Sequence, residues 1–84
     1  MELVVLTPEV EYFKGDIKSI TVPGVSGEFE VLENHAPLVS AIGEGRVKIV
    51  KTDGEHLKFD VNSGFLEVIN NDLALLVNEI KPVD

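Results

Sequence analysis

The sequence contains no cysteine, and with 84 residues it is short for a folded protein. Without cysteine, neither a disulfide bond nor a thiolate metal site can stabilise the fold, so the hydrophobic core must do so alone. A domain of this length buries only roughly 60 to 65% of the surface that the unfolded chain exposes, which predicts modest stability. We expect one domain over residues 1–84.

Basic residues are also scarce, because seven of them stand against fifteen acidic residues and the net charge is −8. Such a field repels phosphate backbones and anionic lipid headgroups, so we expect no nucleic acid partner and no direct lipid insertion. No segment approaches the roughly 20 apolar residues of a membrane helix. The opening MELVVLTPE lacks the basic region of a signal peptide. We expect a soluble protein made in the cytoplasm.

Signatures of catalysis and of cofactor binding are missing as well. No serine lies in a G-x-S-x-G turn, there is no glycine-rich phosphate loop, and no base stands beside a nucleophile. The two histidines, His35 and His56, are far apart and have no cysteine to complete a zinc site. Glu28 and Glu30 could join His35 around a metal, but acids two positions apart usually form the solvated side of a strand. We predict no catalytic residue, metal, nucleotide site or cofactor, and no enzyme activity.

Apolar residues, in contrast, are abundant for a chain in which 26% of the residues are charged. They make up 44% of the sequence, and the mean hydropathy is +0.17. Nearly every apolar position must therefore lie in the core or at an interface. This surplus predicts a surface that a partner buries.

The apolar runs are short, rich in β-branched residues and bounded by Gly, Pro, Asn and Asp, which predicts an all-β fold without useful helices. Leu73–Val77 has helical propensity, but it follows a tight turn and has the length of a buried strand. Many short strands without crossover helices predict two antiparallel sheets packed face to face. The predicted strands are Glu2–Leu6, Val10–Phe13, Asp16–Pro23, Gly27–Leu32, Leu38–Ile42, Gly45–Lys51, His56–Asn62, Gly64–Asn70 and Asp72–Glu79. The predicted core consists of Val5, Phe13, Ile17, Ile20, Val22, Phe29, Val31, Leu38, Val47, Ile49, Phe59, Val61, Phe65, Leu66, Val68, Leu75 and Val77.

Turn residues separate the predicted strands. Asp53-Gly54 and Asn70-Asn71 are typical of tight hairpins. Pro23-Gly24 fits the centre of a type II turn, so we expect positive φ at Gly24 as well as at Gly54. Gly15 is expected to mark a further reversal, as are Gly43, Gly45 and Gly64.

The tetrapeptide Asn34 to Pro37 predicts a stiff loop. Asparagine tolerates a left-handed conformation, and Pro37 biases Ala36 toward an extended one. Ordered loops on a rigid scaffold often carry function. From the residues alone, a histidine such as His35 more often hydrogen-bonds its own backbone than contacts a partner.

The sequence resembles the epsilon subunit of the F-type rotary ATP synthase over nearly all of its length. The matching segments are an opening LVVLTPE, FKGDIKSITVPG, the pattern GE-x-x-VL-x-x-HAPL, SGFLEV and a final DLALLV. Two departures occur at turn or strand-edge positions. Glu33-Asn34 stands where the family often has Pro-Gly, and Glu30 where glycine is common.

The resemblance implies the N-terminal domain of that subunit, a flattened antiparallel sandwich of about ten short strands. It also implies a non-catalytic central-stalk protein of a bacterial, proton-translocating ATP synthase, peripheral at the cytoplasmic face of the inner or another energy-transducing membrane. The expected partners are the gamma subunit and the c-subunit ring, whose rotation it would couple to ATP synthesis. The implied contact residues are Gly27 and Glu28 for the ring, and His35, Ala36, Pro37, Leu38 and Ser40 toward gamma.

Family members commonly continue into a helical hairpin that binds ATP in some of them and can block hydrolysis. Here the last residues are Lys81 to Asp84, and Pro82 discourages a helix. We expect no C-terminal helical hairpin, no ATP binding and no inhibition by insertion. An alternative function is a small β-sandwich module that binds a peptide or sugar at a sheet edge, and a stable complex with gamma would distinguish the two.

Overall fold

A computed structural model describes residues 1–83, and these residues form nine strands and no helix. The strands are β1 Glu2–Leu6, β2 Glu11–Gly24, β3 Gly27–Leu32, β4 Leu38–Ile42, β5 Gly45–Lys51, β6 His56–Val61, β7 Gly64–Ile69, β8 Asp72–Val77 and β9 Ile80–Pro82. The predicted all-β fold is confirmed. None of the described residues forms a helix long and apolar enough to cross a membrane.

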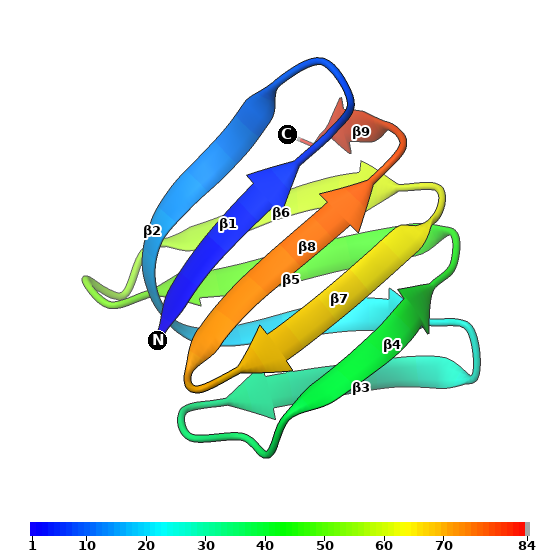
Figure 1. The fold of residues 1–84 in the computed structure, drawn as a ribbon. Coiled ribbons are helices and arrows are strands. Elements are labelled where there is room, and N and C mark those ends of the chain that lie inside the picture. The colour runs from blue at the N-terminus through cyan, green and yellow to red at the C-terminus, as the bar shows by residue number, and fades with distance from the viewer. Residues whose placement is uncertain (84) are drawn as a thin grey trace.

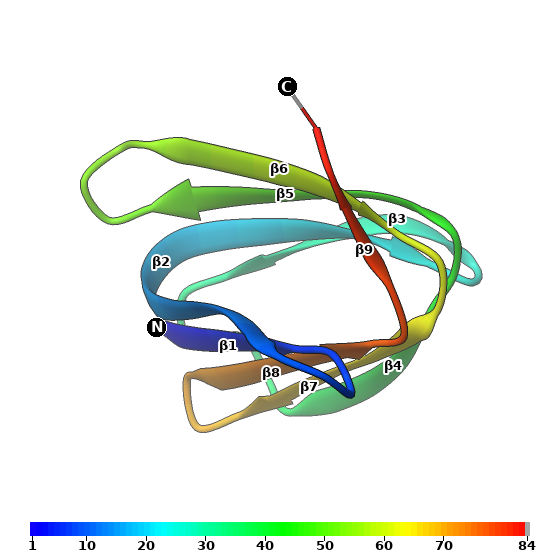
Figure 2. The same cartoon turned by 90° about the horizontal axis from the view of Figure 1, so that it is seen from above.

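The strands form two layers that share β2 (Figures 1 and 2). The first layer runs β4-β7-β8-β1 and ends on the first half of β2, where Glu11 to Asp16 pair with β1. The second layer places the last part of β2 between β3 and β5, followed by β6 and β9. At the other end of β2, Gly24 pairs with Ile42 of β4. The layers are therefore joined by backbone hydrogen bonds on two sides.

One pairing departs from the predicted antiparallel sheets. β1 and β8 lie side by side in parallel, with Glu2 opposite Asp72 and Leu6 opposite Leu76. Parallel neighbours need a long connection, and here the rest of the sandwich supplies it. The pairing places the first strand between β8 and the first half of β2.

The core lies between the layers and is built from alternate residues of each strand. Its largest fully buried side chain is Phe59, and Tyr12 packs edge-on against that ring with centroids 5.0 Å apart. Most of the predicted core is confirmed, with Phe13, Phe29 and Leu38 half-buried against it. The buried apolar residues not predicted are Met1, Leu3, Ile42 and Leu73.

The prediction was wrong for Phe65, whose side chain is 56% exposed. Its neighbour Leu66 is buried, and two successive residues of a strand point to opposite faces. Only one of the pair could therefore enter the core.

Two glycines do not make the predicted reversals. Gly15 lies inside β2, next to the point where that strand passes from one layer to the other, so it marks a bend within a strand. Pro23 and Gly24 are also part of β2, and Gly24 does not have positive φ. The turn is made by Val25 and Ser26, with the positive φ at Gly27.

The end of the chain also differs from the prediction, because the expected strand Asp72–Glu79 ends at Val77. The chain turns at Asn78 and Glu79, and β9 then pairs with β6 in the second layer. The hairpin turns are confirmed, with φ of 89° at Gly54, 50° at Asn70 and 66° at Asn71.

Candidate partner-binding site

The predicted contact residues lie at the two opposite ends of β3 and on β4 (Figure 1). Gly27 and Glu28 begin the strand, whereas His35 lies in the loop after it. Glu28 and Glu30 are exposed on the outward side, and His35 is beyond the strand end, so the three do not converge. Among residues 1–83, no group of three His, Cys, Asp or Glu side chains could hold a metal ion.

The turn before β3 is held rigidly although its tip is exposed. The N–H of Val25 donates to the carbonyl of Ala41 over 3.1 Å, and the N–H of Gly43 donates to Pro23 over 2.8 Å. The Val25 side chain is nevertheless 67% exposed. Gly27 and Glu28 are thus presented on a fixed protrusion with an apolar tip.

The loop from Glu33 to Pro37 is anchored by Asn71 in the turn between β7 and β8. The N–H of Asn34 donates to Oδ1 of Asn71 over 2.8 Å, and Nδ2 of Asn71 donates to Glu33 over 3.5 Å. Glu33 also lies 3.4 Å from the amino group of Met1. Asn34 has the predicted left-handed conformation, with φ of 63°. This network explains how Glu33-Asn34 can form the turn after β3, where the family often has Pro-Gly.

His35 is exposed at the tip of this anchored loop, and its Nδ1 lies 2.7 Å from the carbonyl oxygen of Ala36. Its backbone N–H donates to Leu32 over 3.2 Å. The imidazole therefore bonds the local backbone and is also accessible. Hydrogen bonding to the backbone and contact with a partner are thus compatible at His35.

Replacing Asn71 with glycine should release this loop. Glycine accepts the positive φ at this position, so the change removes the side-chain hydrogen bonds without new backbone strain. We expect a loss of about 1 kcal/mol in stability. Hydrogen exchange at the amides of Asn34 and His35 should become faster. Asn70→Gly is the matched control, because Asn70 also has positive φ but makes no side-chain hydrogen bond within residues 1–83. Equal exchange in both variants would contradict the anchoring role.

On β4, the side chains of the predicted contact residues point toward the core and not toward a partner. Leu38 and Ser40 pair with the buried Val68 and Leu66, so their side chains lie on the core side. The intervening Val39 points outward and is 68% exposed. On this strand, the residue that sequence reasoning missed is the accessible one.

The outer side of the first layer forms an apolar face. One row crosses four strands through Ala41, Phe65, Leu76 and Leu6. The next row holds Val39, Ala74 and Val4 around Glu67. We define the apolar face as Val4, Leu6, Val39, Ala41, Phe65, Ala74 and Leu76.

The apolar face is accessible and shallowly hollowed at one end. Phe65 and Leu76 are 56% and 44% exposed. A depression of about 530 Å³ lies beside them, lined also by Leu6 and Pro8. The signal in the sequence is the apolar content of β7 and β8 on both sides of each strand, which indicates burial on two faces.

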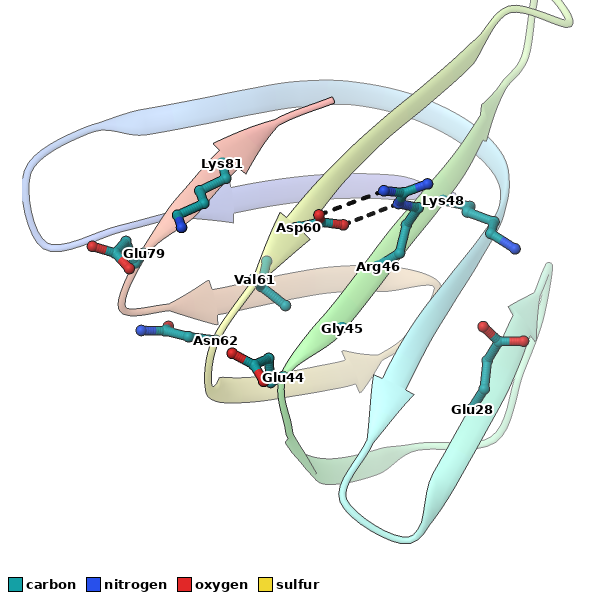
Figure 3. Close-up of a pocket in the computed structure, with 10 residues that line it drawn as sticks. All are labelled: Glu28, Glu44, Gly45, Arg46, Lys48, Asp60, Val61, Asn62, Glu79 and Lys81. Atoms are coloured by element: carbon teal, nitrogen blue, oxygen red, sulfur yellow. Dashed lines mark hydrogen bonds and ion pairs between the residues drawn. The ribbon is translucent and has the colours of Figure 1, made fainter. Parts of the chain in front are cut away.

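The outer side of the second layer is charged (Figure 3). A hollow of about 480 Å³ there is lined by Glu28 on one side of β2 and by Arg46 and Lys48 on the other. Nε of Arg46 donates to Asp60 over 3.0 Å. The hydrogen bond from Arg46 lowers the pKa of Asp60, and the same bond raises the pKa of Arg46. These groups have ordinary ion-pair chemistry, and nothing in this hollow resembles a nucleophile with a base.

Comparison with known proteins gives a consistent result. The family model of the ATP synthase delta/epsilon chain β-sandwich domain matches residues 1–83. The ATP synthase epsilon chain of Chlorobaculum tepidum is 38% identical over 78 residues, which are 93% of this chain and 89% of that protein. The epsilon chain of Protochlamydia amoebophila is 36% identical over 81 residues, 96% of this chain but only 55% of that protein.

Solved structures with this fold include two mitochondrial assemblies. A chain of the Euglena gracilis ATP synthase (OSCP/F1/c-ring) matches with a TM-score of 0.89 at 21% identity, over 98% of this chain and 54% of that one. A chain of the Tetrahymena thermophila mitochondrial ATP synthase (central stalk and c-ring) matches with a TM-score of 0.81 at 20% identity. The match covers 98% of this chain and 66% of that one. At these identities the likeness concerns the fold.

Proposed function

The chain belongs to the family of ATP synthase delta and epsilon chains, and on that premise we propose that it is a non-catalytic central-stalk subunit of a proton-translocating ATP synthase. In this role it binds the gamma subunit and the c ring and couples their rotation to ATP synthesis. It would lie at the cytoplasmic face of the energy-transducing membrane, held there by its partners.

The observation that carries this proposal is the apolar face. A folded monomer rarely leaves a contiguous row such as Ala41, Phe65, Leu76 and Leu6 in water. An interface core is depleted in charge and rich in aromatic and aliphatic side chains, which describes this face. We assign the apolar face to gamma. His35, in the loop that leads into β4, extends the same contact beyond Val39.

The fixed turn between β2 and β3 is the proposed contact with the c ring. Its tip combines the exposed Val25 with Glu28, and two backbone hydrogen bonds hold it to β4 and the residues after it. A rigid tip is suited to transmit torque, because little of the applied rotation is lost in bending the loop. The exposed carboxylate would set orientation more than affinity.

Charge reversal at Glu28 should weaken the ring contact mildly. We expect Glu28→Lys to cost about 1 kcal/mol of association free energy, mainly through a slower on-rate, because an exposed charge is well solvated. The measurement is binding of the variant to detergent-solubilised c ring together with gamma. Glu30→Lys is the matched control, since it reverses a charge on the same side of β3 two positions away. Equal losses in both variants would remove the specific role of Glu28.

A negative charge at His35 should instead weaken binding of gamma. We expect His35→Asp to cost about 2 kcal/mol of binding free energy when the imidazole of His35 is desolvated in the complex. This corresponds to a roughly 30-fold weaker association with gamma. Because His35 is exposed, the melting temperature should stay near that of the wild type. Binding is measured by titrating purified gamma against the intact chain. If wild-type chain formed no complex with gamma, the peptide- or sugar-binding alternative would be preferred.

A further inference from the structure

We propose that Glu67 determines the specificity of the contact with gamma, where it pairs with a basic side chain of that subunit. Glu67 belongs to β7, which lies between β4 and β8 in the first layer (Figure 1). Its side chain is exposed on the outer side of that layer, within the apolar face. This role rests on the proposed function, because it concerns the same contact, and it specifies the chemistry that gamma must present there.

Apolar residues occupy all four positions next to Glu67 on this side of the sheet. Phe65 and Ile69 lie two positions before and after it on β7, and both are exposed. Val39 and Ala74 lie directly opposite it on the neighbouring strands. The core of a protein interface is depleted in charged residues. A single carboxylate among exposed apolar side chains is therefore suited to a partner that offers one matching charge.

Within the described part of the chain, Glu67 has no basic side chain in ion-pair distance. Lys14 ends the same row of residues but lies three strand spacings away, which is about 14 Å. Water solvates the carboxylate in the free chain, so its lack of a partner costs little there. Binding of gamma over the apolar face removes this water, and a desolvated carboxylate without a cation strongly opposes association. Gamma must therefore supply the positive charge.

The surface beside Glu67 has room for a long basic side chain. A hollow of about 340 Å³ adjoins it and is lined by the small side chain of Ala74. The charged residues that line this hollow are three acids and one base, namely Glu2, Glu67, Asp72 and Lys14. The local charge is thus −2 with the base included, so the hollow attracts a cation and repels an anion.

Arginine has the chemistry that suits this position best. Its guanidinium group forms two parallel hydrogen bonds with one carboxylate. The same planar group stacks on aromatic rings, and Phe65 lies on the same side of β7 about 7 Å from Glu67. Its methylene groups would cover Val39 and Ala74. Such a pair fixes the orientation of gamma, because a neutral or acidic residue opposite Glu67 is penalised.

The decisive variant is Glu67→Leu, because the presence and the absence of a facing cation predict opposite results. If gamma places a basic side chain there, leucine leaves that cation desolvated and unpaired. The affinity of the intact chain for purified gamma should then fall about 30-fold or more. If no cation faces Glu67, leucine completes the apolar face, and binding should be unchanged or tighter.

Glu30→Leu is the matched control. It makes the same substitution at an exposed strand position of the second layer, outside the apolar face, so gamma should bind it like the wild type. Both variants should melt no lower than the wild type, since both positions are exposed. For Glu67→Leu we expect mainly faster dissociation, and the loss should persist at about 0.5 M salt, because a covered ion pair is screened little.

The outcomes separate this role of Glu67 from the proposed function. Normal or tighter binding of Glu67→Leu, or an equal loss in Glu30→Leu, would overturn the role of Glu67 and leave the contact with gamma in place. A loss confined to the association rate and abolished by salt would also overturn it, because that result describes long-range attraction without a covered pair. If the wild-type chain did not bind gamma, the proposed function would fail together with the role of Glu67.

Discussion

Replacing Gly64 with alanine is expected to destabilise the fold by about 3 kcal/mol, the upper end of the usual cost of overpacking. A Cβ atom at this position would lie 2.8 Å from Cα of Val77 and 2.9 Å from the carbonyl carbon of Leu76. Both are backbone atoms of β8, so no side chain can rotate away. Gly64 also pairs with Ile42 of β4. The clash must therefore push β7 and β8 apart at the end of the first layer where β7 begins and β8 ends.

Thermal unfolding measures this effect directly. A loss of this size should lower the melting temperature by roughly 10 to 20 °C for a domain of this length. Gly43→Ala is the matched control, because a Cβ there would meet its nearest neighbours at 3.7 Å, an ordinary contact. Its melting temperature should change little or rise slightly. A Gly64→Ala variant as stable as Gly43→Ala would show that β7 and β8 are not packed as described.

At the next residue, Phe65→Glu is expected to abolish most of the association with gamma while leaving the fold intact. Phe65 is the aromatic side chain of the apolar face, and aromatic residues near the centre of an interface dominate its energetics. Placing a charge there should cost about 3 kcal/mol of binding, more than a 100-fold loss of affinity. Because the side chain is already 56% exposed, the melting temperature should hardly change.

Leu32→Glu is the control for this variant. Leu32 is also 56% exposed, but it pairs with Ser19 in the second layer and lies outside the apolar face. Titration with purified gamma should show normal binding for Leu32→Glu and greatly reduced binding for Phe65→Glu. If both variants bound gamma normally, the assignment of the apolar face to gamma would be withdrawn, whatever the result at His35.

Local features of the fold could be predicted from sequence where the conformation depends on one or two residues. Asn34, Gly54 and the Asn70-Asn71 pair adopt the positive φ values that their side chains allow. The same local reasoning was wrong at Pro23-Gly24, because β3 and β4 pair with that end of β2 and the turn moves to Val25 and Ser26. Tertiary hydrogen bonds decided between two acceptable turn positions.

The long-range features could not be predicted from the pattern. Alternation identifies the strands but not their neighbours, so the parallel pairing of β1 with β8 had no local signal. Gly15 indicated an irregularity in β2 but not that the strand continues through both layers. The candidate site shows the same limit. The surplus of apolar residues predicted a buried surface, but only the register of β4, β7 and β8 shows that Val39, Phe65 and Leu76 form it.

The parallel pairing of β1 and β8 also determines when the protein can fold during its synthesis. Glu2 cannot pair before Asp72 has been made, nor Leu6 before Leu76, and the two partners are 70 residues apart in each case. At about 5 to 20 residues per second, the ribosome needs roughly 4 to 14 s to add these 70 residues before the partner strand is made. Until then β1 can pair only with β2, and an isolated two-stranded hairpin is marginal in water. Pairing of β1 with β8 is thus delayed until β8 has been made, which leaves β1 without its second neighbour while the residues between the two strands are synthesised.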